Sequence, residues 1–328
     1  MDRPDDRSED RPDALVARRY VAIGGRGPED VVADARGRVL TGVEDGRILR
    51  LDGLTDPESV RVETLADTGG RPLGLELLPD DGLLVCDAER GLLRVDLTDG
   101  TVRVLADSVA GEPLRGGSNV VALSDGSVYF TVFSLRYPIE RWIGDIVEHT
   151  GTGRLLRLAP GADSPEVLLD GLQFANGLAP SADESFLVVV ETGVRRLTRY
   201  WLTGPKAGRS EPFVEDLPGM PDNLWRAGPD GPIWVALAGP RVAPLELLHQ
   251  AAPAVRQAAA RVAVHMPFRP TGTIGAMAFD DDGAVVHHLA ARGSSYRMAT
   301  SVCEAAGHLV LGSVWERGIA LCEPPLPK

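Results

Sequence analysis

The chain has 328 residues, of which 44% are hydrophobic and 25% are charged, and it carries a formal net charge of −13 at pH 7. This composition is typical of a globular protein. The negative charge argues against nucleic acid or an anionic membrane as a partner, because both are polyanions. No apolar run approaches the ~18 residues that a membrane-spanning helix needs.

The first residues, "MDRPDDRSEDRPDA", are charged and rich in proline and contain no apolar segment. We therefore predict a disordered tail over residues 1–14 rather than a signal peptide, one domain over residues 15–328, and a cytoplasmic location. The three cysteines, Cys86, Cys303 and Cys322, are odd in number and form no CxxC pair, so we expect neither a disulfide framework nor a zinc site.

After this tail, short runs of strand-forming residues follow one another along the chain, each after a turn, as in "GRVLTGV", "GSVYFTV" and "SFLVVVE". The turns are separated by 45, 44, 58, 47 and 76 residues, and they are centred on Gly37, Gly82, Gly126, Glu184, Gly231 and Gly307. A period near 45 residues with several strands in each unit predicts an all-β fold, a six-bladed β-propeller.

The two longest intervals predict insertions at about residues 133–153 and 239–270. The Ala-rich stretch 244–263 of the second insertion has leucines at helical spacing, so we expect a short helix near the mouth of the propeller channel. The last blade, after about Thr300, is too short for four strands. We predict that an early strand at residues 16–23 completes this blade and closes the ring.

Four polar residues occupy the same phase of the repeat: Glu29, Asn119, Asn176 and Asp222 precede their turns by seven to nine residues. They fall at the start of the innermost strand of four blades, so their side chains should converge on the channel. Together with Asn223 they would form an oxygen-rich site that suits Ca²⁺, whereas zinc would need His or Cys. Taken singly, each could also be a turn residue that bonds its own backbone.

Several stretches, among them "GPEDVVADARGRVLTGVEDGRILRL", "LLDGLQFANGLAP" and "LPGMPDNL", resemble the strictosidine synthase-like branch of six-bladed propellers, which is related to gluconolactonases and paraoxonases. The resemblance extends from about residue 20 to residue 322. It implies that calcium is held by the five residues named above and polarises a lactone carbonyl or a phosphoryl oxygen. It further implies that Asp222 acts as the general base or the nucleophile.

The chain also departs from its relatives. Strictosidine synthase relies on a Glu in the last blade, and Thr300 aligns with that position, so we expect no strictosidine-forming reaction and assign Thr300 to substrate binding. Val120 and Val132 stand where many relatives have Asp, which predicts a more apolar site. Paraoxonases place a His at the mouth where this chain has Leu73.

The leading hypothesis from the sequence is a calcium-dependent hydrolase that cleaves a small lactone or ester. Arg136, Tyr137 and Trp142, in the first insertion, are expected to contact this small-molecule substrate, although packing against a blade would explain them equally well. One alternative is an enzyme of secondary metabolism that catalyses a cyclisation, condensation or isomerisation in the same pocket. Another is a non-catalytic propeller that binds a ligand. The sequence gives no indication of the oligomeric state.

Overall fold

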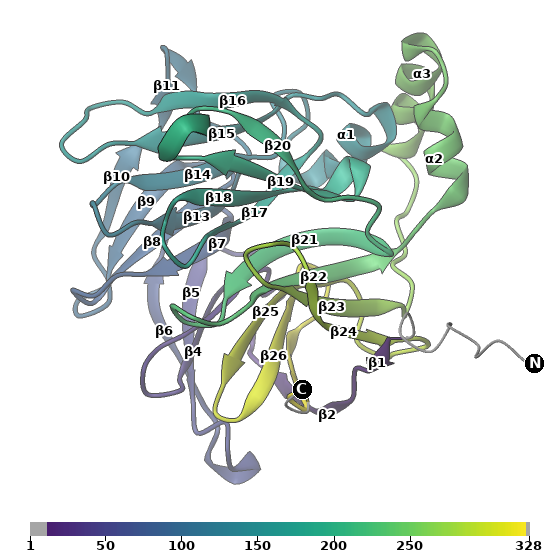
Figure 1. The fold of residues 1–328 in the computed structure, drawn as a ribbon. Helices are drawn as coiled ribbons and strands as arrows, with labels where there is room; N and C mark the ends of the chain where they lie inside the picture. The colour runs from purple at the N-terminus through teal and green to yellow at the C-terminus, as the bar shows by residue number, and fades with distance from the viewer. Residues whose placement is uncertain (1–11, 326–328) are drawn as a thin grey trace, which may run out of the picture.

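The computed structural model describes residues 12–325, and these residues form a six-bladed β-propeller, as predicted (Figure 1). In each blade four strands pair antiparallel, and they follow one another in chain order from the channel outward except in the sixth blade, whose outer strand comes from the N-terminal part of the chain. The predicted tail at residues 1–11 lies outside the described residues.

The first three blades use residues 31–172. The first blade consists of β3 (Val31–Ala33), β4 (Val39–Gly42), β5 (Arg47–Asp52) and β6 (Arg61–Asp67). The second consists of β7 (Pro72–Leu77), β8 (Gly82–Asp87), β9 (Gly91–Asp96) and β10 (Val102–Ala106). A small hairpin of β11 (Ser108–Val109) and β12 (Glu112–Pro113) precedes the third, which consists of β13 (Gly117–Ala122), β14 (Val128–Val132), β15 (Gly153–Leu158) and β16 (Glu166–Leu172).

The remaining blades bring the two ends of the chain together. The fourth consists of β17 (Ala175–Pro180), β18 (Phe186–Glu191), β19 (Arg196–Trp201) and β20 (Ser210–Val214). The fifth contains β21 (Gly219–Arg226), β22 (Ile233–Pro240), β23 (Ile274–Phe279) and β24 (Val285–Ala291). The sixth contains β25 (Ala299–Ala305), β26 (His308–Ser313), β27 (Gly318–Cys322) and β2 (Ala17–Ala22).

The ring closes as the sequence predicts, because β2 pairs antiparallel with β27 and becomes the outer strand of the sixth blade. Shortly before β2, two residues form β1 (Asp13–Ala14), which pairs in parallel with β24 and covers the edge of the fifth blade. The prediction of disorder is therefore wrong for Asp13 and Ala14. Their backbone groups, and the Leu15 N–H that donates to the Ala290 carbonyl at 2.9 Å, gain partners on an otherwise open sheet edge.

The innermost strands of neighbouring blades contact one another and line the channel. All six predicted turns lie between the first and second strands of their blades. Four of them need a left-handed backbone conformation: Gly37, Gly126 and Gly307 have φ between 74° and 82°, and Glu184 has φ 55°. Glycine adopts this conformation without strain, which explains its recurrence in the repeat.

Both predicted insertions contain helices, and these lie together at one end of the molecule (Figure 1). The first holds α1 (Trp142–Glu148), which the sequence did not predict. The second holds α2 (Ala243–His249) and α3 (Pro253–Ala263) in place of the single helix predicted over residues 244–263. The break precedes Pro253, where Ala252 has the extended ψ of 147° that a following proline favours. No helix in residues 12–325 is long and apolar enough to span a membrane.

Candidate functional site

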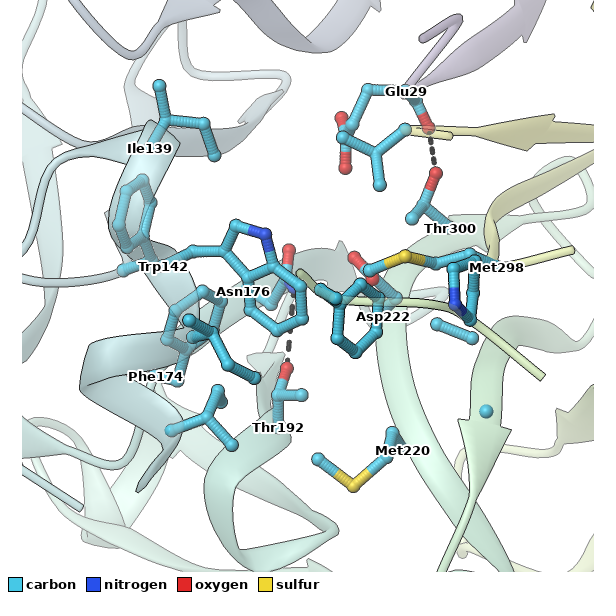
Figure 2. Close-up of a pocket in the computed structure, with 18 of the residues that line it drawn as sticks. Glu29, Ile139, Trp142, Phe174, Asn176, Thr192, Met220, Asp222, Met298 and Thr300 are labelled. Atoms are coloured by element: carbon cyan, nitrogen blue, oxygen red, sulfur yellow. Dashed lines mark hydrogen bonds between the residues drawn. The ribbon is translucent and has the colours of Figure 1, made fainter. Parts of the chain in front are cut away.

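A cavity of about 200 Å³ opens at the helical end of the channel. Its walls are apolar and come from the inner strands, from the insertions and from the connections between blades. They include one continuous buried cluster, in which the rings of Phe133 and Phe174 stack with centroids 5.0 Å apart. Its floor is polar and consists of Glu29, Ser118, Asn176, Thr192, Asp222 and Thr300 (Figure 2).

The floor residues on the inner strands share one local feature of the backbone: each lies where the pairing of its strand with the next strand is irregular. An irregularity of this kind leaves residues unpaired and turns side chains that would otherwise follow the regular alternation. The breaks in register fall at Gly117–Val120, Ala175–Leu178, Pro221–Leu224 and Ala299–Ser301. Irregular pairing of the inner strand thus directs polar side chains into the channel from four blades.

Two glycines let the inner strands approach closely enough to form this floor. A Cβ atom at Gly177 would lie 2.3 Å from the Leu224 nitrogen, directly beside Asp222 and Asn223. A Cβ atom at Gly74 would lie 2.4 Å from the Cα of Asn119. Any larger residue at these positions would force the strands apart.

Three of the predicted ligands are joined by hydrogen bonds. The Asn223 side-chain amide donates to Glu29 Oε1 at 2.9 Å, and Asn119 Nδ2 donates to Asn223 Oδ1 at 3.2 Å. Asn119 Oδ1 in turn accepts from the Leu178 backbone at 3.0 Å. Asn119 and Asn223 are buried but do not line the cavity, so they lie behind Glu29 and hold it in place.

The amide of Asn176, which lies in the floor, is oriented by hydroxyl groups. Asn176 Oδ1 accepts from Ser118 Oγ at 3.0 Å, and its amide donates to Thr192 Oγ1 at 3.3 Å. On the opposite side, Thr300 Oγ1 donates to the backbone carbonyl of Glu29 at 2.6 Å (Figure 2). Ser118 and Thr192 are floor residues that the repeat phase did not single out.

Two carboxylate oxygens in the floor have no partner. Glu29 is 5% exposed and Asp222 is 7% exposed, yet Glu29 Oε2 and Asp222 Oδ1 are buried without a hydrogen bond among the described residues. Burial, together with the nearby carboxylates of Asp222 and Asp30, raises the pKa of Glu29 well above its usual range. Burial also raises the pKa of Asp222 to about 8, with the Asn176 amide opposing and Asp30 adding to the rise.

This floor fits a hard cation better than a transition metal. Across residues 12–325, no group of three or more His, Cys, Asp and Glu side chains is placed to hold a metal ion. The metal ligands that the floor offers include two carboxylates and the Asn176 amide oxygen, and each carboxylate has one oxygen without a partner. Calcium accepts such oxygen donors and completes its coordination with water or substrate.

Comparison with known proteins places the chain in a family. The strictosidine synthase family model matches residues 119–205, and the model for the N-terminal part of strictosidine synthase-like proteins matches residues 13–51. Strictosidine synthase-like 6 of Arabidopsis thaliana is 31% identical over 309 residues, covering 93% of this chain and 81% of that protein. The chain belongs to the strictosidine synthase-like family.

Further similar proteins come from plants and from animals. Strictosidine synthase-like 3 of Arabidopsis thaliana is 32% identical, covering 92% of this chain and 83% of that protein. The adipocyte plasma membrane-associated protein of Rattus norvegicus is 34% identical, covering 66% of this chain and 60% of that protein.

Solved structures share the propeller of this family member at low sequence identity. A gluconolactonase from Xanthomonas campestris superimposes with a TM-score of 0.65 at 18% identity, covering 95% of each chain. The calcium-binding protein regucalcin from Agrobacterium tumefaciens superimposes with a TM-score of 0.63 at 16% identity, covering 95% of this chain and 94% of that one. At these identities the likeness establishes the fold.

Of the four residues predicted to contact substrate, two line the cavity and two lie outside its lining. Trp142 and Thr300 line the cavity. Arg136 and Tyr137 do not: Arg136 pairs with Glu148 at 3.1 Å, and the Tyr137 hydroxyl donates to the same carboxylate. They fasten the loop before α1 to its last turn, so their role is in packing, although against α1 rather than against a blade as the sequence analysis suggested.

The two valines that replace acidic residues also lie elsewhere. Val120 and Val132 are buried in the core between the second and third blades, packed with Leu84, Cys86 and Phe130, and neither lines the cavity. The prediction that they make the site apolar is wrong. The apolar walls come instead from the insertions, from connections such as the one that carries Met298, and from inner-strand residues such as Met220 of β21 (Figure 2).

Proposed function

We propose that this member of the strictosidine synthase-like family is a calcium-dependent hydrolase of a small, largely apolar lactone or ester. The observation that carries the proposal is the pair of partnerless carboxylate oxygens, Glu29 Oε2 and Asp222 Oδ1, in a buried floor that also contains the Asn176 amide. A buried carboxylate without a partner is costly, and a cation shared by both would remove that cost.

Glu29, Asn176 and Asp222 would hold the ion, with Asn119 and Asn223 orienting Glu29 from behind or joining the ligand set. When bound, the ion supplies a Lewis acid that polarises the substrate carbonyl. The names gluconolactonase and calcium-binding protein, carried by propellers of the same fold, are consistent with this choice of reaction and metal.

Residues of the chain would carry out the chemical step and bind the substrate. Asp222 would accept the proton of the attacking water or attack the carbonyl itself, because it is the carboxylate that faces the cavity beside Asn176. Trp142, Phe174 and Met220 would bind the apolar part of the substrate and exclude bulk water from the floor. Thr300 keeps the backbone of Glu29 in position through its hydrogen bond.

The first test measures calcium content by elemental analysis, and thermal unfolding with chelator and with added calcium. We expect about one calcium ion per chain, and calcium at about one hundred times its Kd should stabilise the fold by about 2.7 kcal/mol. Hydrolysis of a panel of lactones and esters should depend on calcium. Asp222→Asn should lose this activity by at least about 100-fold and lose most of the calcium stabilisation.

Asp230→Asn is the matched control, because Asp230 is exposed in the same blade and the substitution removes the same charge far from the cavity. It should behave as the wild type. Calcium binding without hydrolysis of any lactone or ester would instead favour a ligand-binding propeller or a secondary-metabolism enzyme with another reaction. Absence of any calcium response would refute the proposal.

A further inference from the structure

The cavity has a single basic side chain in its lining, and it lies at the mouth. Glu29 and Asp222 are the acidic lining residues and form part of the floor, whereas Arg269 belongs to the segment that leads from α3 back to β23. Arg269 is exposed, and among the described residues it is the only basic side chain in a lining that, apart from Thr271, is otherwise apolar above the floor. The cavity is therefore polarised, with carboxylates at one end and a guanidinium group at the other.

The position of Arg269 is fixed by its neighbours in the chain. The ring of Phe268 packs edge-on against Trp142, with centroids 5.1 Å apart, and against Trp315, with centroids 6.3 Å apart. On the other side, Pro270 is buried and lines the cavity. The backbone of Arg269 is thus held between two anchored residues, while its side chain remains at the surface.

No group of the described residues pairs with the guanidinium of Arg269. Within residues 12–325, Arg269 has neither a hydrogen bond nor an ion pair, whereas Arg241, at the start of the same insertion, pairs with Asp216 at 2.8 Å and with Glu246 at 2.9 Å. The sequence explains the difference. In a chain with 47 Asp and Glu residues, the segment 247–279 has none, so no acidic neighbour in the segment competes for Arg269.

We infer that the substrate carries a carboxylate at the end opposite its reacting carbonyl, and that Arg269 binds this carboxylate. A guanidinium group presents a planar pair of N–H donors that matches a carboxylate, and the apolar walls between mouth and floor suit a hydrocarbon spacer. The inference rests on the proposed function only in assigning the reacting end of the substrate to the floor. Arg269 then sets both the orientation and the charge preference of the site.

The test uses a ligand that cannot be hydrolysed: the straight-chain keto acid 8-oxononanoate, whose methyl ketone imitates an ester carbonyl, and its primary amide. Binding to the full-length protein in the presence of calcium is measured by calorimetry and by the fluorescence of the tryptophans, of which Trp142 lines the cavity. The wild type should bind the acid about tenfold more tightly than the amide, the effect of one charge-assisted contact. Added salt should reduce this preference, because Arg269 is exposed.

Arg269→Gln should abolish the preference by weakening the acid alone. Arg261→Gln is the matched control, because Arg261 is an exposed arginine of α3 that does not line the cavity, and it should keep the preference. Equal binding of acid and amide by the wild type, no binding of either, or a preference that survives in Arg269→Gln would each overturn the inference. Because the ligands do not react, an Arg269-dependent preference would stand even if no ester were ever hydrolysed.

Discussion

Glu29 and Asp30 are neighbours in the chain and both are buried in the channel, but they line different cavities. Glu29 lines the cavity at the helical end, and Asp30 lines a separate cavity of about 260 Å³ that residues further along the inner strands enclose. Both oxygens of Asp30 accept backbone N–H groups, from Val31 at 2.8 Å and from Leu75 at 2.9 Å. One oxygen of Glu29 accepts none from the described residues.

This contrast separates a structural carboxylate from a functional one. Burial raises the pKa of both side chains, to about 7 for Asp30 and well above the usual range for Glu29, so titration alone does not distinguish them. The hydrogen bonds do: Asp30 joins the first blade to the second, while Glu29 keeps an oxygen available for a ligand. The predictions below test that difference.

The largest effect is expected for Glu29→Gln. The amide keeps an oxygen to accept from Asn223 but removes the negative charge that would hold calcium. We expect hydrolysis to fall by about 100-fold or more and the stabilisation by calcium to disappear. The free energy of unfolding in chelator, measured with urea, should stay at the wild-type value or rise, because a partnerless buried carboxylate has gone. A large loss of stability in chelator would show that Glu29 is structural after all.

Asp30→Asn should give the opposite result. An asparagine offers one oxygen where two backbone N–H groups, of Val31 and Leu75, now find two, so one donor would face the new NH₂ group. We expect the free energy of unfolding in chelator to fall by about 1–3 kcal/mol, the cost of a buried donor without a partner. Calcium should still raise the melting temperature of this variant. A variant as stable as the wild type but without a calcium response would contradict the assignment.

The floor of the site could be predicted from the sequence because it follows the repeat. Asn176 and Asp222 lie on inner strands and Glu29 lies just before one, at similar points of the repeat, and any repeat that brings those points to one axis brings the side chains together. The phase does not distinguish a residue that faces the cavity from one behind it. Asn119 and Asn223 therefore fell into the same predicted set, although in the structure Asn223 bonds to Glu29 and Asn119 bonds to Asn223.

The walls could not be predicted, because they depend on the parts of the chain that break the repeat. The sequence located both insertions but gave no contact between them, and Trp142 and Phe268 meet only when α1 and the segment after α3 fold together. Arg269 was missed for the same reason, since nothing in "MPFRPTG" indicates a cavity. Arg136, in the same insertion as Tyr137 and Trp142, looked like a binding residue and is an ion-pair partner of Glu148.

Gly177→Ala tests whether close strand packing positions the functional end of the channel. The added methyl group would lie 2.3 Å from the Leu224 nitrogen, so β17 and β21 must separate and Asn176 must move away from Asp222. We expect a loss of about 1–3 kcal/mol in the free energy of unfolding, and weaker calcium binding in titrations. Gly239→Ala, whose methyl group would meet nothing within 4 Å, is the control for stability. Equal calcium affinity in Gly177→Ala and the wild type would show that the floor tolerates a shift of these strands.

The last prediction concerns the pH dependence of stability, to which the carboxylates of Asp222 and Asp30 both contribute. The pKa is raised to about 8 for Asp222 and to about 7 for Asp30, whereas both would be near 3.9 in the unfolded chain. Between about pH 4 and pH 8 the folded protein therefore holds protons that the unfolded chain has released, and in chelator its stability should fall as the pH rises. Calcium binds the ionised carboxylates, so its stabilising effect should grow over the same interval. Urea unfolding across this range, with chelator and with calcium, measures both trends. In Asp222→Asn the free energy of unfolding in chelator should fall less steeply with rising pH, because only Asp30 and Glu29 would still contribute. An unchanged slope would mean that Asp222 is already ionised without metal.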